Sequence, residues 1–389
     1  MGMKSETKFE KLVTFIKDLY PEYEKVPLHA PVFLGNEKQY LSECIETTYV
    51  SYVGRFVEKF ELEIQNFTKA NYAIATVNGT SALHIALLMA GVESNDEVLT
   101  QALTFVATTN AIKYCNAEPV FIDSEREQLG MDPVVLSDFL YKNARIGDDG
   151  FCYNISTKRR IMACVPVHIF GHPSRTTEIL SICNEFNIKV VEDAAEALGS
   201  YEGANHCGLK GDIGILSFNG NKLVTTGGGG MILTNDKELA ERARHITTTA
   251  RVIKQFDFFH DQLGYNYRMT NLNAAVGLAQ MENISKVLSN KRKTAQLYAD
   301  FCRDHELNFF EEKTGYTSNY WLNTIFLKDK SERDEFLQYS NSRGVMTRPA
   351  WTLMPDLPMY RNCQQSKLDV ARDLADRIVN LPSSFRSNE

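Results

Sequence analysis

Two spacings of apolar residues run along this chain, and they separate the expected helices from the expected strands. Apolar positions recur every three or four residues in 8–20, 55–68 and 286–305, which is the pattern of a helix with one buried face. Short apolar runs such as 97–101 and 213–218 have the length and composition of buried strands. The chain is therefore expected to be a mixed α/β protein.

Between residues 72 and 245, the expected strands alternate with expected helices. This order is typical of parallel βαβ units, whose ligands lie at the carboxyl ends of the strands. After about residue 250 the pattern is less regular, and it ends with helical spacing at 368–380. We predict an arm helix in residues 1–27, a large α/β domain with a mostly parallel sheet in 28–252, and a smaller α/β domain in 253–389.

Composition narrows the class of protein. With 43% hydrophobic and 23% charged residues, the 389-residue chain has the composition of a globular protein, and its net charge of −7 argues against a nucleic-acid partner. No apolar run approaches the ~20 residues of a membrane span, and the N-terminus lacks the apolar core of a secretory signal. The eight cysteines include no CxxC pair, so no metal site is expected. We expect a cytoplasmic protein without a membrane partner.

The segment Asn78-Gly-Thr-Ser81 lies between an expected strand and an expected helix. Free N–H groups and the helix dipole at such a position favour a phosphate, and the two hydroxyl groups add donors. A Thr or Ser that only caps the helix would leave the same pattern. Gly79 and Thr80 are therefore candidates for binding an anion.

Three further residues lie at the ends of expected strands. Asp193 ends a buried run, where a carboxylate needs a cationic or hydrogen-bonding partner, although it could also cap a turn. Lys222 lies between an apolar run and four glycines, which suits a Schiff-base lysine as well as a lysine in a flexible surface loop. Phe105 could stack on a planar ring or pack in the core. Together with an anion site, these groups are what pyridoxal 5′-phosphate (PLP) requires.

Six motifs carry a wider resemblance: 78–83 (NGTSAL), 103–108 (LTFVAT), 192–195 (EDAA), 217–218 with Lys222, 225–227 (TTG) and 264–268 (GYNYR). They resemble the DegT/DnrJ/EryC1/StrS sugar aminotransferases, which are fold-type I PLP-dependent transferases with the architecture of aspartate aminotransferase. The resemblance covers residues 31–384. Phrases such as 218–222 (FNGNK) are most similar to the LegC-type branch, which aminates C4 of nucleotide-linked 4-keto-6-deoxy sugars.

The resemblance implies a role for each motif. Lys222 would bind the cofactor as a Schiff base and move a proton between the amino donor and the cofactor. Asp193 would keep the ring nitrogen protonated, and Phe105 would stack on the ring. The phosphate would be bound by Gly79, Thr80 and Ser217.

The resemblance also implies a homodimer with shared active sites, because Asn266 would reach the phosphate from a second subunit. Glu196 occupies a position near the cofactor hydroxyl where relatives often have Gln or His. A carboxylate beside a phenolate-like oxygen is unfavourable unless it is protonated or hydrogen-bonded. Gly228 stands where many relatives have Glu.

The implied substrates are L-glutamate as the amino donor and a nucleotide-linked keto sugar, such as UDP-2-acetamido-2,6-dideoxy-hexos-4-ulose, as the acceptor. The 4-amino product would serve a surface polysaccharide or a nonulosonic acid. The candidate substrate residues are Tyr49, Ser51, His168, Arg268 and Trp351, although His168 could equally be a histidine that only ends a strand. Two other functions remain open: a PLP-dependent sugar dehydratase, in which His replaces the lysine, and a regulatory protein that has kept the fold without the chemistry.

Overall fold

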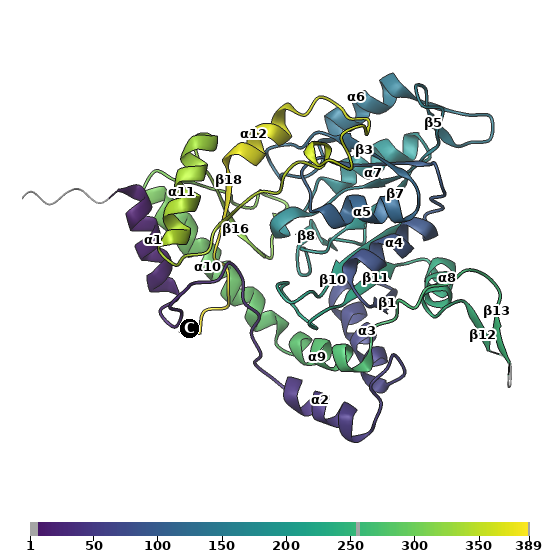
Figure 1. Cartoon of the computed structure of the whole chain (residues 1–389), viewed down its shortest axis with the longest axis horizontal. Coiled ribbons are helices and arrows are strands. Elements are labelled where there is room, and N and C mark those ends of the chain that lie inside the picture. Colours follow the sequence, from purple (N-terminus) through teal and green to yellow (C-terminus); the bar gives the residue numbers. More distant parts are fainter. Residues whose placement is uncertain (1–6, 254–256, 388–389) are drawn as a thin grey trace, which may run out of the picture.

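The computed structural model describes residues 7–253 and 257–387 and contains a large, mostly parallel sheet covered by helices on both faces (Figure 1). The strand order is β1-β11-β10-β7-β6-β2-β3, and β11 alone runs antiparallel to its neighbours. The strands are β1 (Tyr72–Thr76), β2 (Glu97–Gln101), β3 (Glu118–Ile122), β6 (Ile161–Val165), β7 (Lys189–Asp193), β10 (Ile213–Ser217) and β11 (Gly230–Thr234). This arrangement confirms the expected α/β fold.

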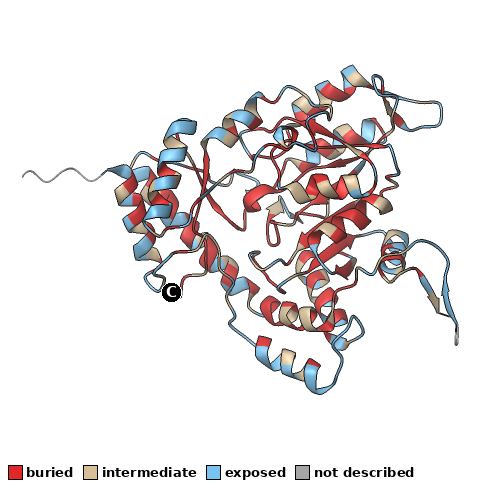
Figure 2. Cartoon of the chain, viewed as in Figure 1, coloured by how far each residue is buried: buried red, intermediate tan, exposed pale blue. Residues whose placement is uncertain are grey.

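Alternation of side chains along the strands divides the core between the two faces of the sheet. In β7, Val190 packs on one face and Val191 on the other. The first face carries α3 (Arg55–Thr68), α6 (Pro133–Asn143), α7 (Thr176–Glu185) and α9 (Asn271–Met281). The opposite face carries α4 (Gly79–Met89), α5 (Val106–Tyr114) and α8 (Lys237–Thr247). Figure 2 shows that the strands and the inward faces of these helices are buried, while their outer faces are exposed.

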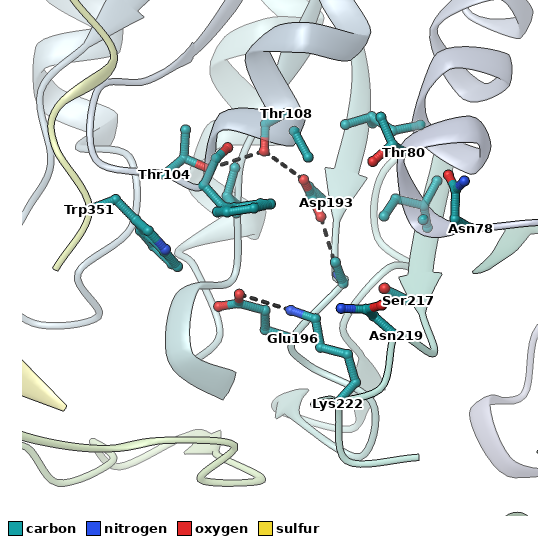
Figure 3. A pocket seen from close by; sticks show the side chains of 17 residues that line it. Asn78, Thr80, Thr104, Thr108, Asp193, Glu196, Ser217, Asn219, Lys222 and Trp351 are labelled. Atoms are coloured by element: carbon teal, nitrogen blue, oxygen red, sulfur yellow. Dashed lines mark hydrogen bonds and ion pairs between the residues drawn. The ribbon is translucent and has the colours of Figure 1, made fainter. Parts of the chain in front are cut away.

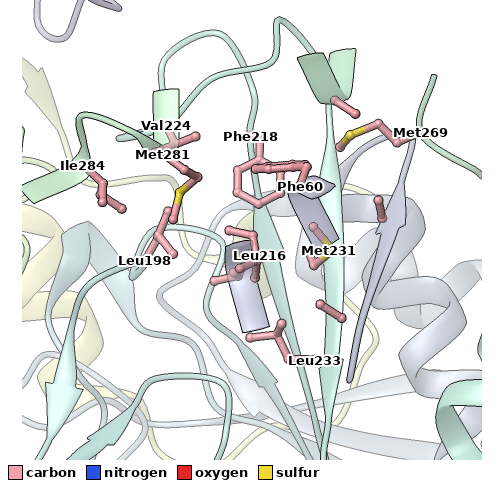
Figure 4. Close-up of a cluster of buried hydrophobic side chains, with 14 of the residues drawn as sticks. Phe60, Leu198, Leu216, Phe218, Val224, Met231, Leu233, Met269, Met281 and Ile284 are labelled. Atoms are coloured by element: carbon pink, nitrogen blue, oxygen red, sulfur yellow. The ribbon is translucent and has the colours of Figure 1, made fainter. Parts of the chain in front are cut away.

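One of these apolar clusters includes Phe218 and Val224, which flank the loop that carries Lys222 (Figure 4). Phe218, the residue after β10, is fully buried, and its ring meets that of Phe60 at 5.0 Å between centroids. Backbone bonds close the loop, since Phe218 N–H donates to the Gly229 carbonyl and Thr226 N–H donates to the Phe218 carbonyl. The loop is therefore anchored at both ends.

A second group of elements surrounds the sheet β14-β16-β18-β17. Its strands are β14 (Asn308–Phe309), β16 (Asn323–Phe326), β17 (Arg348–Pro349) and β18 (Ile378–Leu381). The helices are α1 (Lys8–Leu19), α10 (Ile284–Asp304), α11 (Lys330–Ser342) and α12 (Asp369–Arg377). The buried face of α1 packs against α10, α11, β16 and β18, so the first helix belongs to the same apolar core as the last strand. The domain boundaries at residues 27 and 252 stay a prediction.

Short elements complete the described chain. They are α2 (Glu37–Glu46), the hairpins β4 (Ala144–Ile146)–β5 (Cys152–Asn154) and β12 (Arg251–Ile253)–β13 (Phe258–His260), the sheet of β15 (Tyr316–Thr317), β8 (Tyr201–Glu202) and β9 (Asn205–His206), and the 3₁₀ turns η1 (Ile169–Gly171) and η2 (Met354–Asp356). Within the described residues, no helix is both long and apolar enough to cross a membrane, and no cluster of His, Cys, Asp and Glu could hold a metal ion.

Candidate active site

A cavity of about 260 Å³ opens at the carboxyl ends of β1, β2, β7 and β10. Figure 3 shows labelled side chains that point into it from the ends of these strands and from the segments that follow them, together with Trp351 from the segment after β17. The polar and catalytic candidates on its wall are Asn78, Gly79, Thr80, Thr104, Phe105, Thr108, Asp193, Glu196, Ser217, Asn219, Lys222 and Trp351. The fold thus brings together eight residues predicted from the sequence: Gly79, Thr80, Phe105, Asp193, Glu196, Ser217, Lys222 and Trp351.

The N-terminus of α4 forms one end of the cavity. Asn78 caps this helix, because its side-chain oxygen accepts a hydrogen bond from the Ser81 N–H at 2.7 Å. Asn78 is therefore the helix cap, so Thr80 is not needed for capping and lines the cavity wall. The Gly79 N–H belongs to the first helical turn, which has no intrahelical acceptor. This end of the cavity therefore has the donors and the dipole of an anion site.

Two glycines let the backbone pass close to this helix end. A Cβ on Gly79 would lie 2.9 Å from Cβ of Ser217, and a Cβ on Gly230 would lie 2.4 Å from the Asn78 carbonyl oxygen. The glycine run after Lys222 therefore permits close approach of β11 to the α4 N-terminus. This finding replaces the flexible-loop alternative with a packed turn.

Asp193 lies at the end of β7 and is 5% exposed. Its Oδ2 accepts a hydrogen bond from Thr108 Oγ1 at 2.8 Å, and its Oδ1 accepts one from the Ala195 N–H at 3.1 Å. Both donors are neutral, which leaves this buried carboxylate without a compensating charge from them. A protonated ring nitrogen in the cavity would supply that charge.

Lys222 and Glu196 form an ion pair across the cavity floor (Figure 3), with 3.0 Å between Nζ and Oε1. The other carboxylate oxygen of Glu196 accepts the Phe170 N–H at 2.8 Å, and Phe170 has a left-handed backbone with φ of 58°. Burial raises the pKa of Glu196 above its ordinary value, and the Lys222 ammonium opposes this shift. The carboxylate is thus held by two donors in a site that disfavours its charge.

Phe105 lines the cavity and leaves 51% of its surface exposed. Its ring lies 6.2 Å from the ring of Trp351, which stacks at 4.9 Å on Phe170. A large exposed aromatic ring that lines a cavity is suited to stacking on a planar ligand. The core-packing alternative for Phe105 does not apply.

Two predicted substrate residues lie away from the cavity. His168 is 1% exposed. Its Nε2 is hydrogen-bonded to Glu192 Oε2 at 2.9 Å, and its Nδ1 accepts a hydrogen bond from the Ser174 N–H at 2.9 Å. Arg268 is 8% exposed and pairs with Glu61 at 2.9 Å. Both side chains are engaged in buried contacts and line no part of the cavity formed by this chain, so their roles toward a substrate stay predictions.

Three other predicted residues lie on the surface of this single chain. Tyr49 and Ser51 belong to the exposed loop after α2. Asn271 donates hydrogen bonds to the backbone carbonyls of both residues. Asn266 is exposed and lines no part of the cavity formed by its own chain. Their roles toward a substrate or a second subunit stay predictions.

Trp321 was not singled out from the sequence. Its ring lies below Lys222, with 4.0 Å between Nζ and the ring centroid. Thr108, too, had no predicted role of its own and appeared only within the motif 103–108. A hydroxyl one helical turn after Thr104 could have suggested a buried contact. No local signal indicated Trp321, because it meets Lys222 across 99 residues of chain.

The cavity fits PLP: an anion site, a ring-stacking phenylalanine, a buried carboxylate and a lysine face one another at the ends of the strands. The fold and this site define a fold-type I PLP-dependent enzyme. Residues 34–388 match the DegT/DnrJ/EryC1/StrS aminotransferase family, and the chain belongs to that family. Its members are PLP-dependent sugar aminotransferases, so the resemblance and the cofactor expected from the sequence are confirmed.

Individual relatives agree with this assignment. The chain is 37% identical to a GDP-perosamine synthase from Escherichia coli O157:H7, over 92% of this chain and 93% of the relative. It is 32% identical to the putative pyridoxal phosphate-dependent aminotransferase EpsN of Bacillus subtilis (strain 168), over 94% and 93% of the two chains. Among solved structures, Helicobacter pylori PseC, an aminotransferase involved in pseudoaminic acid biosynthesis, has a TM-score of 0.82 at 20% identity and covers 92% of this chain and 93% of its own.

Proposed function

We propose that this enzyme transfers the amino group of L-glutamate to C4 of a 4-keto-6-deoxy sugar linked to a nucleoside diphosphate, such as UDP-2-acetamido-2,6-dideoxy-hexos-4-ulose. The product is a 4-amino sugar for a surface polysaccharide or a nonulosonic acid. The observation that carries the proposal is the pair of Asp193 and Lys222 facing one cavity beside the α4 anion site. The relatives named GDP-perosamine synthase support a nucleotide-linked sugar that is aminated at C4.

Each residue of the cavity has a defined task in this reaction. When bound, PLP supplies an electrophilic carbonyl carbon and a ring that accepts electrons. Lys222 would hold that carbon through Nζ and would move a proton at the same atom. Asp193 would keep a proton on the ring nitrogen, and Phe105 would cover the ring face and exclude water. The phosphate is bound by backbone N–H groups at Gly79 and Thr80 and by the Ser217 hydroxyl.

The presence of Lys222 favours transamination over the two alternatives. A dehydratase of this fold was expected to carry His at this position, and a regulatory protein has no need for Lys222 and Asp193 to face one cavity. The ion pair of Lys222 with Glu196 supports the same choice, because it holds Nζ at the cavity floor.

The proposal includes a homodimer. Asn266 and the loop with Tyr49 and Tyr52 are exposed, and both tyrosines leave more than 40% of their surface uncovered. A second copy would cover this loop and bring Asn266 to the neighbouring phosphate. Sedimentation equilibrium of the holoenzyme should give twice the 44.1 kDa of one chain, and a monomer would contradict the shared site.

The deciding experiment is a panel of UDP-, GDP- and dTDP-linked 4-keto-6-deoxy sugars, with and without the 2-acetamido group, incubated with ¹⁵N-labelled L-glutamate. We expect ¹⁵N at C4 of one sugar class, detected by mass spectrometry and NMR, and no transfer by Lys222→Ala. Transfer to C3, or a label-free dehydrated product, would contradict the proposal. A panel with no product from the PLP-loaded enzyme would contradict the 4-keto-6-deoxy acceptor.

A further inference from the structure

Trp321 is the aromatic residue in contact with the Lys222 amino group. Nζ lies 4.0 Å from the centroid of the indole ring and 3.0 Å from Oε1 of Glu196. All three side chains are shielded, with 5% exposure for Trp321 and side-chain exposures of 13% for Lys222 and 6% for Glu196. The amino group is therefore held between an aromatic face and a carboxylate.

The position of the indole is fixed through its polar atoms. Its Nε1–H donates to the carbonyl of Asn221 at 2.7 Å, and Asn221 immediately precedes Lys222. The backbone N–H of Trp321 donates to Asn319 Oδ1 at 2.7 Å, and its carbonyl accepts from Lys291 Nζ at 3.0 Å. The ring is thus bound to the loop that it supports, and it has little freedom to move away from Nζ.

An aromatic face attracts a cation and has little attraction for a neutral amine. The carboxylate of Glu196 acts in the same direction, and the low exposure strengthens both attractions. The indole face and the carboxylate therefore both attract the Lys222 ammonium. Transamination uses both forms, because the neutral amine attacks a carbonyl and takes a proton, whereas the ammonium gives a proton back.

We propose that Trp321 is a positioning residue for Lys222: its indole face holds the released amino group beside Glu196 and stabilises the positive charge that develops as Nζ takes a proton. In that step the C–H bond at Cα of the amino donor breaks. Its electron pair passes into the ring of the bound cofactor, and the proton passes to Nζ. The same proton is then delivered to C4′ of the cofactor, which restores the neutral amine. This inference rests on transamination and does not depend on the identity of the sugar.

Several other ionisable groups lie near Lys222. Asp193 lines the same cavity, and Glu196 is its ion-pair partner. Burial and the positive charges of Lys291 and Lys222 lower the pKa of His29 well below its ordinary value, so His29 is neutral in the working pH range. Lys291 lies behind Trp321, where burial lowers its pKa. Trp321 therefore contributes an attraction for the Lys222 ammonium that does not titrate.

The test is to place mono-, di- and trifluorotryptophan at position 321 by codon suppression. Fluorine removes π-electron density while the ring shape and the Nε1–H donor remain. Two rates are measured near pH 7 by absorbance: covalent capture of PLP by the apoprotein, and conversion of the loaded enzyme by L-glutamate. Across the series, capture should become about 3- to 10-fold faster, because a weaker ring holds the amino group less firmly beside Glu196, and conversion should become slower by a similar factor.

Fluorinated phenylalanines at Phe336 are the matched control, because that ring is fully buried in the core shared with α1 and lines no part of the cavity. They should leave the capture rate unchanged. Equal capture rates across the Trp321 series, or a series in which both rates fall together, would overturn the proposal and indicate a purely structural role. If the native enzyme does not respond to glutamate, the donor proposal fails, while the capture rates still decide the role of Trp321.

Discussion

Thr108 connects the buried Asp193 carboxylate to helix α5. Its hydroxyl donates to Asp193 Oδ2 at 2.8 Å and lies 3.0 Å from the hydroxyl of Thr104. This contact orients a carboxylate whose task is to hold a proton on the cofactor ring. Since hydrogen bonds to charged groups contribute ~1.5–3 kcal/mol, loss of this donor should be measurable.

We expect Thr108→Val to slow the conversion of the loaded enzyme by glutamate about 10-fold or more, because Asp193 loses an orienting donor. The matched control is Thr109→Val on the same helix. The Thr109 hydroxyl is buried and has no hydrogen-bond partner among the described residues, so its removal should change the rate little. Stopped-flow absorbance gives both rates, and equal effects of the two substitutions would contradict the role assigned to Thr108.

At the scale of single residues, the sequence predicted those whose chemistry is visible in their own segment. Lys222 and Asp193 stand at the ends of apolar runs, and both line the cavity. His168 has the same local pattern but is bound by Glu192, which no spacing reveals. The position of Trp321 depends on packing between two distant segments, and local pattern carries no information about such a contact.

At the scale of elements, the close approach of β11 to the start of α4 forms the anion site. Gly230 pairs with Thr76 and with Ser217 and lies against the Asn78 carbonyl. Any Cβ there would push the helix N-terminus away from its position. Gly228 differs, since a Cβ there would meet only the Val77 carbonyl oxygen, at 3.9 Å.

We therefore expect Gly230→Ala to weaken PLP binding about 10-fold or more, because the displaced helix end loses hydrogen bonds to the phosphate, each of which contributes ~1.5–3 kcal/mol. Gly228→Ala should bind PLP like the native chain. Equilibrium titration of each apoprotein with PLP measures this, and circular dichroism checks that both variants are folded. Equal affinity of the two variants would refute the account of the glycine run.

The elements themselves were largely predictable because their hydrophobic faces repeat with a clear period. Helix α3 and strand β2 have the bounds expected from the pattern. Helix α12, however, ends at Arg377, although helical spacing was expected to continue to residue 380. There the pairing of β18 with β16 decides the conformation, and pairing with a strand more than fifty residues away cannot be inferred from periodicity.

At the scale of the whole molecule, His172 links the two groups of elements. Its ring is fully buried between Phe310 at 4.6 Å and Tyr320 at 5.3 Å. Neither ring nitrogen has a hydrogen-bond partner in the described part of the chain. Burial lowers the pKa of His172 from 6.5 to about 3.

This shift predicts a loss of stability in acid. The unfolded chain binds a proton at His172 below pH 6.5, whereas the folded chain binds it only near pH 3. The contribution of His172 to the free energy of unfolding is therefore complete above pH 6.5. It falls by ~1.4 kcal/mol per pH unit between pH 6.5 and about 3. In His172→Phe, the midpoint temperature of thermal unfolding at pH 5 should rise toward the midpoint at pH 8. The same change at the exposed His260 should leave the difference between the two midpoints as it is in the native chain.

The packing of α1 has a consequence for the order in which the chain folds during synthesis. Phe9, Leu12 and Ile16 are buried against residues that include Phe336, Val379 and Leu381. These partners of α1 therefore leave the ribosome well after the strands of the large sheet are complete. Until then its apolar face has no native surface to cover, and we expect it to be a binding site for chaperones on the nascent chain.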